Sequence, residues 1–178
     1  MRKPGDSARM PVLETHRLIL REFTLADAGF IVELLNEPAF IEFIGDKGVR
    51  DPAGAEQYLR NGPLANHAKH GFGLWCVTLK DGTPAGMCGL IKRDFLPHPD
   101  IGFAFLARFN GQGYGHESAS AVLHHARSHL NLTTIHALTA FKNPASVRLL
   151  GKLGFDFVDF IQQPGYAEPS RLFSSKSN

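Results

Sequence analysis

Apolar and polar positions along the chain follow two different periods. Short stretches with a period of two, typical of half-buried strands, are interleaved with stretches in which apolar residues recur every three or four positions, as on one face of a helix. Leucines alternate with arginines in residues 17–23 and predict a strand. Residues 24–36 have helical spacing, with Thr24 or Asp27 as the N-cap. We therefore expect a mixed fold of helices and strands.

The middle of the chain predicts a β-hairpin. Two apolar runs within residues 72–91 flank Asp81 and Gly82, a dipeptide that favours a tight turn, so we expect the two strands to be antiparallel. Before the hairpin, residues 53–71 have a helical pattern that a Gly-Pro pair interrupts, and residues 37–53 form a long connection. Connections of this kind often contact substrates.

The second half of the chain adds strands and helices in alternation. The first strand, residues 100–107, carries Ile101, Phe103 and Phe105 on one face, whereas the small residues between them leave the other face nearly bare. That bare face has room for something other than a side chain. The remaining elements are expected as a helix ending near residue 130, a strand at 133–141, a helix at 143–155, and strands at 155–160 and 170–175.

Composition is that of an ordinary globular domain. The 178 residues are 43% hydrophobic and 20% charged, and a chain of this size buries roughly 70% of its unfolded surface. We expect one domain at residues 12–174, between a flexible N-terminal tail at 1–11 and a C-terminal tail at 175–178. No apolar run reaches the roughly 18 residues that span a bilayer, and no signal peptide is evident. These features predict a cytoplasmic protein without a membrane partner.

Charge and cysteine usage argue against two further classes of protein. The formal charge is +2 without a cluster of Lys and Arg, so we expect no nucleic-acid partner. Cys76 and Cys88 lie in separate apolar segments without CxxC spacing and are expected as buried thiols. His125 and His129 have the i, i+4 spacing of a zinc site, but Ala126 stands where the HExxH motif needs Glu, so we expect no metal.

Three glycines, Gly111, Gly113 and Gly115, stand at alternate positions just before a predicted helix, in the sequence NGQGYGHES. A helix N-terminus carries unsatisfied amides and about half a positive charge. Glycines there let an anion approach the backbone closely, whereas an ordinary turn is the plainer alternative. The dinucleotide fingerprint fails because His116 or Ser118 stands at its last glycine, and no Gly-Lys-Ser/Thr follows as in a Walker motif.

Five segments follow one another in the second half of the chain: the strand DIGFAFLA, the helix start NGQGYGHES, the strand TTIHALTAF, and the helix motifs NPAS and KLGF. In order and spacing they resemble the GNAT acyl-CoA N-acyltransferases, and within them the branch of the ribosomal-protein acetyltransferases RimJ and RimL. The opening LETHRLILREFTLADAGFIVELL resembles the same branch, so that the resemblance covers roughly residues 12–160. It implies an α/β (α+β) GNAT fold, with a single mixed, mostly antiparallel sheet of about six to seven strands, about four flanking helices, and a splay between the strands at 100–107 and 133–141.

The resemblance also implies a site for acetyl-CoA as co-substrate. The cofactor would lie in the splay, with its pantetheine arm along the backbone of residues 103–105 and its pyrophosphate on the amides of residues 111–116. Asn143, at the Asn of the family's NxxS motif, would contact the pantetheine arm, with Ser146 beside it. The implied cofactor-binding residues are Phe103, Ala104, Phe105, Gly111, Gln112, Gly113, Tyr114, Gly115, His116, Asn143 and Ser146.

The chain departs from the family at the groups that move protons. Leu150 stands where many members have the Tyr that protonates the leaving thiolate, and Leu138 where some have a Glu base. The resemblance leaves Ser146 as the candidate acid, and Asp100 or His136 as the candidate base. Each has a plainer alternative: a backbone-bonding residue in the first helical turn, a solvated strand start, and a half-buried strand histidine.

The sequence therefore predicts direct transfer of an acetyl group from acetyl-CoA to a primary amine, on a protein N-terminus or on a small molecule, by a monomer or homodimer. A non-catalytic acyl-CoA binding or sensing module is the alternative, because the family's Tyr and Glu are missing. Glu37, Glu42 and Asp46 would attract an ammonium substrate or simply form a solvated acidic loop. We expect the loops around 37–53, 92–99 and 160–170 to select the acceptor.

Overall fold

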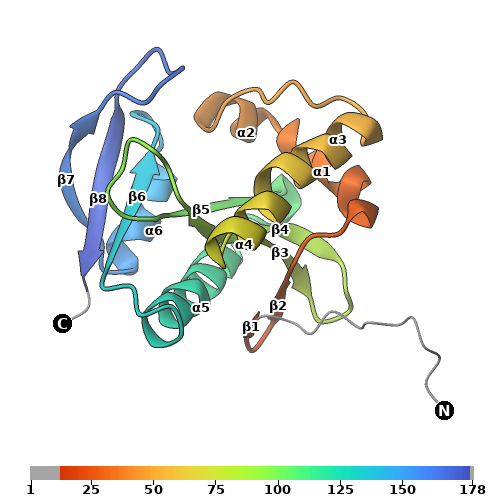
Figure 1. The fold of residues 1–178 in the computed structure, drawn as a ribbon, viewed down its shortest axis with the longest axis horizontal. Helices are drawn as coiled ribbons and strands as arrows, with labels where there is room; N and C mark the ends of the chain where they lie inside the picture. The colour runs from red at the N-terminus through yellow and green to blue at the C-terminus, as the bar shows by residue number, and fades with distance from the viewer. Residues whose placement is uncertain (1–12, 177–178) are drawn as a thin grey trace.

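A single mixed sheet with helices on both faces forms the computed structural model, which describes residues 13–176 (Figure 1). Its eight strands follow the order β1-β2-β3-β4-β5-β6-β8-β7. The strands are β1 Leu13–Glu14, β2 Leu18–Arg21, β3 Leu74–Leu79, β4 Pro84–Ile91, β5 Asp100–Phe105, β6 Thr134–Thr139, β7 Asp156–Ile161 and β8 Ser170–Lys176. The α-helices are α1 Ala28–Leu35, α2 Pro38–Phe43, α3 Pro52–Leu59, α4 Ala65–His70, α5 Tyr114–Ser128 and α6 Pro144–Lys152.

The only parallel neighbours in this sheet are β5 and β6; all other neighbouring strands of the described chain are antiparallel. These two strands pair at just two positions, Asp100 with His136 and Ile101 with Ala137. Both strands continue for several residues without further pairing to each other. The mixed, mostly antiparallel sheet and its splay between the strands at 100–107 and 133–141 are thus confirmed, as is the β3–β4 hairpin.

Successive residues of the central strands point to opposite faces and build two cores. In β3, Trp75 and Val77 pack with residues of α5 and α6, whereas Leu74 and Cys76 pack with residues of α1 and α3. Cys76 and Cys88 are free and buried, as predicted. Burial raises the pKa of each thiol to about 12, so both stay protonated and unreactive at neutral pH.

The predicted strand and helix at the start of the chain are confirmed, with Thr24 as the N-cap. Thr24 Oγ1 accepts a hydrogen bond from the amide of Ala26 (3.1 Å), and Asp27 Oδ2 accepts one from the amide of Thr24 (2.8 Å). This reciprocal capping box begins a short 3-10 turn that leads into α1. Asp27 also accepts hydrogen bonds from the Arg21 guanidinium (2.9 and 2.8 Å), which ties the turn to β2.

Three elements differ from the prediction. β1 raises the number of strands to eight, above the expected six to seven, because a strand of two residues is too short to show a period. The helix α2 occupies part of the expected connection at 37–53 and begins with Pro38, which suits the first turn of a helix. The helical stretch at 53–71 continues past its Gly-Pro pair, because a π-helical turn around Pro63 joins α3 to α4.

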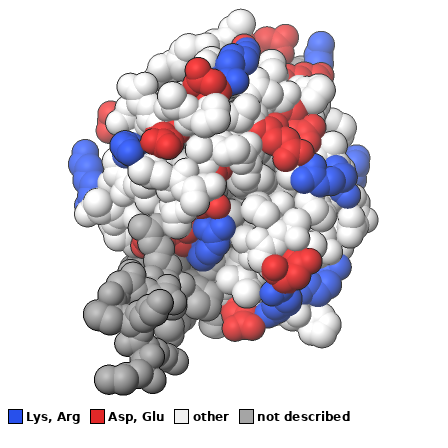
Figure 2. Space-filling view, turned by 90° about the vertical axis from the view of Figure 1, so that its right-hand side faces the viewer, with Lys and Arg blue, Asp and Glu red and all other residues white. Residues whose placement is uncertain are grey.

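The described residues begin with β1 and end with β8. β8 extends to Lys176, two residues beyond the predicted domain end at 174, whereas the predicted tail at 1–11 and residues 177–178 lie outside the described residues. Between residues 13 and 176, no helix is both long and apolar enough to cross a bilayer. Figure 2 shows acidic and basic side chains interspersed over the face that it presents.

Substitution of Gly89 tests the close contact between β4 and the backbone at the start of β3. A Cβ at Gly89 in β4 would lie 2.1 Å from the carbonyl oxygen of Gly73 and 2.7 Å from Cα of Leu74. Because both contacts are with backbone, Gly89→Ala should lower the free energy of unfolding by about 1–3 kcal/mol. Gly29→Ala is the control, since a Cβ on this exposed residue of α1 meets nothing within 4 Å. Urea unfolding should show a lower midpoint for Gly89→Ala alone, and equal midpoints would contradict the packing described.

Candidate active site

A cavity of about 690 Å³ lies where β5 and β6 separate. β5 lines it along its whole length, and the last residues of β6 line it on the other side of the gap. The N-terminal ends of α5 and α6 border one part of the cavity, and α2, α3 and the β7–β8 loop border another. Of the residues predicted for the site, the cavity brings together Asp100, Phe103, Ala104, Phe105, Gly111, Gly113, Tyr114, Gly115, His116, Asn143 and Ser146.

The three glycines at the start of α5 are required for two different structural reasons. Gly111 and Gly113 have φ angles of 75° and 82°, in the left-handed region that side chains rarely adopt. Gly115 lies in the first turn of α5, where a Cβ would lie 3.1 Å from Cδ2 of Leu149. The first two glycines therefore shape the loop, and the third lets α5 approach α6 closely.

The backbone amides of residues 111–116 are free. Within residues 13–176, none of them donates a hydrogen bond to a protein acceptor, and the first helical bond of α5 is donated by the amide of Glu117 to the carbonyl of Gly113 (3.0 Å). The loop and the first turn of α5 thus present a row of unsatisfied donors at the positive end of the helix dipole. This arrangement suits an anion such as a phosphate.

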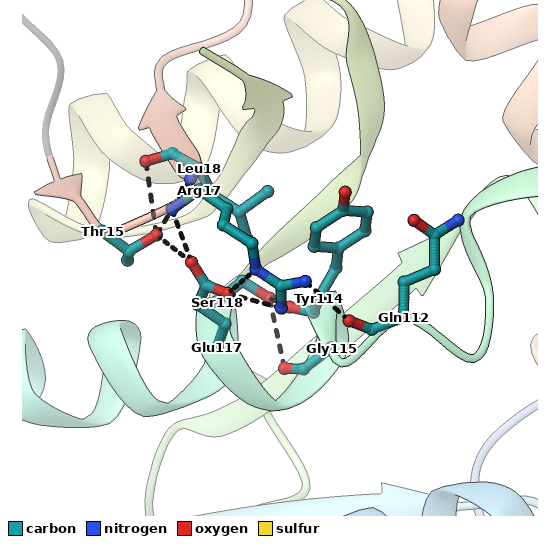
Figure 3. A network of polar contacts seen from close by, with 8 residues as sticks. All are labelled: Thr15, Arg17, Leu18, Gln112, Tyr114, Gly115, Glu117 and Ser118. Carbon is teal, nitrogen blue, oxygen red and sulfur yellow. Dashed lines mark hydrogen bonds and ion pairs between the residues drawn. The ribbon is translucent and has the colours of Figure 1, made fainter.

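A network of polar contacts anchors this loop to the connection between β1 and β2 (Figure 3). The Arg17 guanidinium donates to Oε2 of Glu117 (2.7 Å) and to the carbonyl oxygen of Gln112 (2.9 Å), and it lies 4.6 Å from the ring centre of Tyr114. Oε1 of Glu117 accepts hydrogen bonds from the Thr15 hydroxyl (2.7 Å) and the Arg17 amide (2.8 Å). Gln112 is thus held by its carbonyl and does not line the cavity.

The sequence gives no local signal for this network, because the partners lie about a hundred positions apart. Burial alone would raise the pKa of Glu117, but the hydrogen bonds from Thr15 and Arg17 outweigh it and lower the pKa. The carboxylate is therefore held in its charged form.

Asn143 and Ser146 form the N-terminal cap of α6. The Asn143 Oδ1 atom accepts from the amide of Ser146 (3.3 Å), and its Nδ2 atom donates to the Ser146 hydroxyl oxygen (3.0 Å). Asn143 is therefore a helix cap in this structure, and both residues also line the cavity. Because the Ser146 oxygen acts as an acceptor here, its hydroxyl hydrogen is left to donate to another group.

Asp100 is buried at the end of the cavity where β5 and β6 still pair. Its 1% exposure makes the alternative of a solvated strand start wrong. Oδ1 accepts a hydrogen bond from Nε of Arg93 (2.8 Å). Burial raises the pKa of Asp100, and the positive charge and hydrogen bond of Arg93 offset part of that rise. The carboxyl group is thus a better proton acceptor than an exposed aspartate.

His136, the other candidate base, does not line the cavity. It is a buried strand residue whose ring lies 5.2 Å from that of His98, and its Nδ1 atom has no hydrogen-bond partner among the described residues. Burial, and then the neighbouring His98, lower its pKa. Leu138 and Leu150, by contrast, both line the cavity.

Several cavity residues were missed by the sequence analysis. Lys47 and Arg93 bring positive charge to it, and Tyr58 and Tyr166 line it with Phe43. They come from separate loops and helices, so no spacing along the sequence links them.

No group of three or more His, Cys, Asp or Glu side chains in residues 13–176 is arranged to hold a metal ion. The rings of His125 and His129 stack at 5.0 Å on α5. Of the acidic loop residues, Glu37 accepts from the amide of Ala107 (3.1 Å) and Asp46 pairs with Arg50 (2.6 Å).

The sheet opens between the parallel strands β5 and β6, and the N-terminus of α5 lies beside the opening with free amides. This combination can be compared with known protein families. The family model described as "Acetyltransferase (GNAT) domain" matches residues 17–156. The chain therefore belongs to the GNAT acetyltransferase family, which confirms the resemblance stated from its sequence.

Known proteins extend this comparison over nearly the whole chain. "Uncharacterized protein YkkB" of Bacillus subtilis (strain 168) is 27% identical over 169 residues, which cover 93% of this chain and 95% of YkkB. The crystal structure of the acetyltransferase from Agrobacterium tumefaciens str. C58 has a TM-score of 0.80 at 24% identity and covers 94% of this chain and 95% of its own. RimL, the ribosomal L7/L12 alpha-N-protein acetyltransferase in complex with coenzyme A, has a TM-score of 0.81 at 14% identity, covering 93% and 97%. The two structures show the same fold.

The anchoring of the loop by Glu117 can be tested through its pH dependence. Glu117→Gln should lower the free energy of unfolding by about 1–2 kcal/mol at neutral pH, because a charged acceptor becomes a neutral one and solvent screens the half-exposed Arg17. The folded protein holds the pKa of Glu117 below its unfolded value, so this stabilisation is complete above roughly pH 4.3 and is lost as the pH falls through the folded pKa.

Denaturant unfolding across the acid range measures this effect. The difference in free energy of unfolding between wild type and Glu117→Gln should close in acid. Glu56→Gln is the control, since its 3.4 Å contact with Arg60 is exposed, and it should change stability by less than about 0.5 kcal/mol. A difference that does not depend on pH would contradict the assignment.

Proposed function

We propose that this protein transfers the acetyl group of acetyl-CoA to a primary amine by direct attack of the amine on the thioester. The observation that carries the proposal is the row of free amides before and in the first turn of α5, of which those of residues 111 and 113–116 belong to residues that line the cavity at the splay of β5 and β6. These amides would bind the pyrophosphate. RimL was solved with coenzyme A and the microcin C7 immunity acetyltransferase MccE with acetyl-CoA, and both share the fold of this chain.

The backbone of residues 103–105 would hold the pantetheine arm. These residues pair with β4 on one side and with no strand on the other, where they line the cavity. An extended ligand can therefore hydrogen-bond to β5 as an added strand would. Asn143 and Ser146 lie across the cavity at the start of α6 and would contact the same arm.

Acetyl transfer needs an amine that has lost its proton. An α-amino group, with a pKa of roughly 7.7–8, loses it far more readily than a lysine side chain at about 10.4. We assign the removal of this proton to Asp100, directly or through water, because burial has raised its pKa. An amide on the unpaired side of β5, beside the thioester, would stabilise the oxyanion, and the Ser146 hydroxyl would donate to the departing thiolate.

The extent of the cavity favours an enzyme over a module that only binds acyl-CoA. The cavity continues from the start of α6 to α2, α3 and the loops at 92–99 and 162–169, so it has room for a second substrate. A module that only binds acyl-CoA does not need that space or a buried carboxylate within it. The acceptor would enter on this side, between the loops that the sequence analysis expected to select it.

Acetyl-CoA binding at the glycine loop can be tested with Gly113→Val. A branched side chain at this position should block the phosphate and weaken acetyl-CoA binding at least about tenfold in calorimetry. Gly82→Val is the matched control: Gly82 also has a left-handed φ, of 90°, and open space around it, but it lies in the β3–β4 turn away from the cavity. Equal affinity of the two folded variants would contradict the phosphate assignment.

The proton-transfer roles can be tested with Asp100→Asn and Ser146→Ala. Each should lower kcat by about 10²–10⁴, the usual contribution of a general acid or base, with acetyl-CoA affinity changed by no more than a few fold. Asp46→Asn is the control, because this carboxylate pairs with Arg50 outside the cavity. Stopped or continuous assays of CoA thiol release measure kcat. Full turnover by both variants would mean that positioning of a neutral amine suffices.

A further inference from the structure

The cavity carries two cations at the end remote from the glycine loop. Lys47 and Arg93 both line it; Arg93 contacts Asp100, and the positive charge of Arg93 acts on Lys47. In residues 13–176, the Lys47 ammonium makes no hydrogen bond or ion pair, and the Arg93 guanidinium uses only its Nε atom, on Asp100. The two Nη groups of Arg93 and the ammonium of Lys47 are therefore open to a ligand.

This end of the cavity lies where the acceptor must bind. β5 runs from Asp100 to Phe105, which at about 3.3 Å per residue places Asp100 roughly 17 Å from the strand end that leads to the glycine loop. If the phosphates lie at that loop and the pantetheine arm along β5, the thioester points toward Asp100 and Arg93. Groups of the acceptor near its amine would then meet these side chains.

The charges at this end do not balance. One carboxylate, Asp100, accompanies two cations, and the carboxylate is already paired with Arg93. Lys47 is exposed at the rim of the cavity, where partial loss of solvent, and then the positive charge of Arg93, lower its pKa. A bound anion would relieve this repulsion, whereas a substrate with only positive charges, such as a polyamine, would add to it.

We propose that the acceptor is a free α-amino acid, whose carboxylate binds Arg93 and Lys47 while its amine faces Asp100. This inference rests on the proposed function. An α-amino acid carries opposite charges one carbon apart, and the site offers opposite charges 2.8 Å apart, between Oδ1 of Asp100 and Nε of Arg93. The guanidinium Nη groups suit a carboxylate, which they can bind through two parallel hydrogen bonds.

The residues that line the cavity near Lys47 would select the side chain of the amino acid. Phe43, Tyr58 and Tyr166 line the cavity, and burial raises the pKa of Tyr58 to about 12, so its ring stays neutral. The Tyr166 hydroxyl donates to the carbonyl oxygen of Ile44 (2.6 Å), which joins the β7–β8 loop to the end of α2. This lining suits an apolar or aromatic side chain of the amino acid.

A peptide N-terminus fits this site less well, because its first residue has an amide in place of the α-carboxylate. The Lys47 ammonium and the Nη groups of Arg93 would then stay without a partner. In the reaction, the ammonium loses a proton to Asp100 or water, its nitrogen forms a bond to the acyl carbon, and the C–S bond breaks. The products are the N-acetylamino acid, the CoA thiol and one net proton.

Matched acceptors test the proposal with the wild-type protein. L-leucine, L-methionine and L-phenylalanine are each compared with the corresponding amide and the corresponding decarboxylated amine, by CoA thiol release under saturating acetyl-CoA. At least one free acid should have a kcat/KM at least about tenfold above its amide and amine, even though the amide has the less basic amine.

Three results would overturn the inference. Amides or amines that react as well as the acids would overturn it while leaving the proposed acetyltransferase in place. Peptides with an N-terminal Asp or Glu that react while the free acids do not would assign the carboxylate to a side chain of a polypeptide. Acetyl-CoA binding without CoA release for any acceptor would instead overturn the proposed function itself.

Substitutions identify the groups that bind the carboxylate. Lys47→Met should raise KM for the amino acid about tenfold or more, with KM for acetyl-CoA within about twofold, because it removes an open cation and leaves the Asp100–Arg93 pair intact. Arg93→Gln should raise it further, but it also leaves Asp100 unpaired, so Lys47→Met decides the test if that variant does not fold. Lys69→Met is the control, an exposed lysine of α4 that does not line the cavity. An unchanged KM in folded Lys47→Met would contradict the proposal.

Discussion

The early end of the hydrogen bonding between β5 and β6 is the constraint on which the rest of the site depends. The strands pair through Asp100 and Ile101 and then part, so that the following backbone groups of β5 face a cavity on that side. Backbone amides and carbonyls that lose their partners are costly when dry, so such a gap persists only where water or a ligand satisfies them. A gap of this shape within a sheet is a slot for an extended molecule that can hydrogen-bond along its length.

The gap is kept open by what packs beneath the two strands. α5 packs against β4 and β5, α6 packs against β6, and the two helices meet where Gly115 approaches Leu149. The same turn of α5 carries the free amides and is anchored to the connection between β1 and β2 by Arg17 and Glu117. One helix start therefore fixes both the separation of the strands and the place where an anion can bind.

Local patterns in the sequence predicted most of the fold. The β3–β4 hairpin, β5, β6 and the two helices after the splay all have clear periods, caps or turn residues, such as Asn143 before Pro144. α2 was missed because its six residues lie in a stretch that reads as a loop, and β1 because two residues cannot show alternation. Short elements of this kind are decided by tertiary packing and not by their own propensity.

The candidate site was predictable only where its parts are adjacent in sequence. The glycine loop and the cap of α6 are local motifs, and the cavity contains both. Arg17 and Glu117, or Lys47 and Arg93, come together only because distant segments fold onto the same sheet, so no spacing in one sequence reveals them. The residues around Lys47 and Arg93 belong to this second kind, which is why the sequence predicted the glycine-loop end of the cavity better than the end near Asp100.

Stability alone does not account for the burial of the Asp100–Arg93 pair. Taking a carboxylate out of water is costly, and a buried ion pair is often no more stabilising than apolar residues of the same volume. Asp27, another buried carboxylate, caps a helix turn in addition to its pairing with Arg21. Asp100 instead borders the cavity, with its partner partly exposed there. Its negative charge is thereby paired with Arg93, which leaves the charge of Lys47 uncompensated, so that this end of the cavity would favour a ligand that brings its own anion.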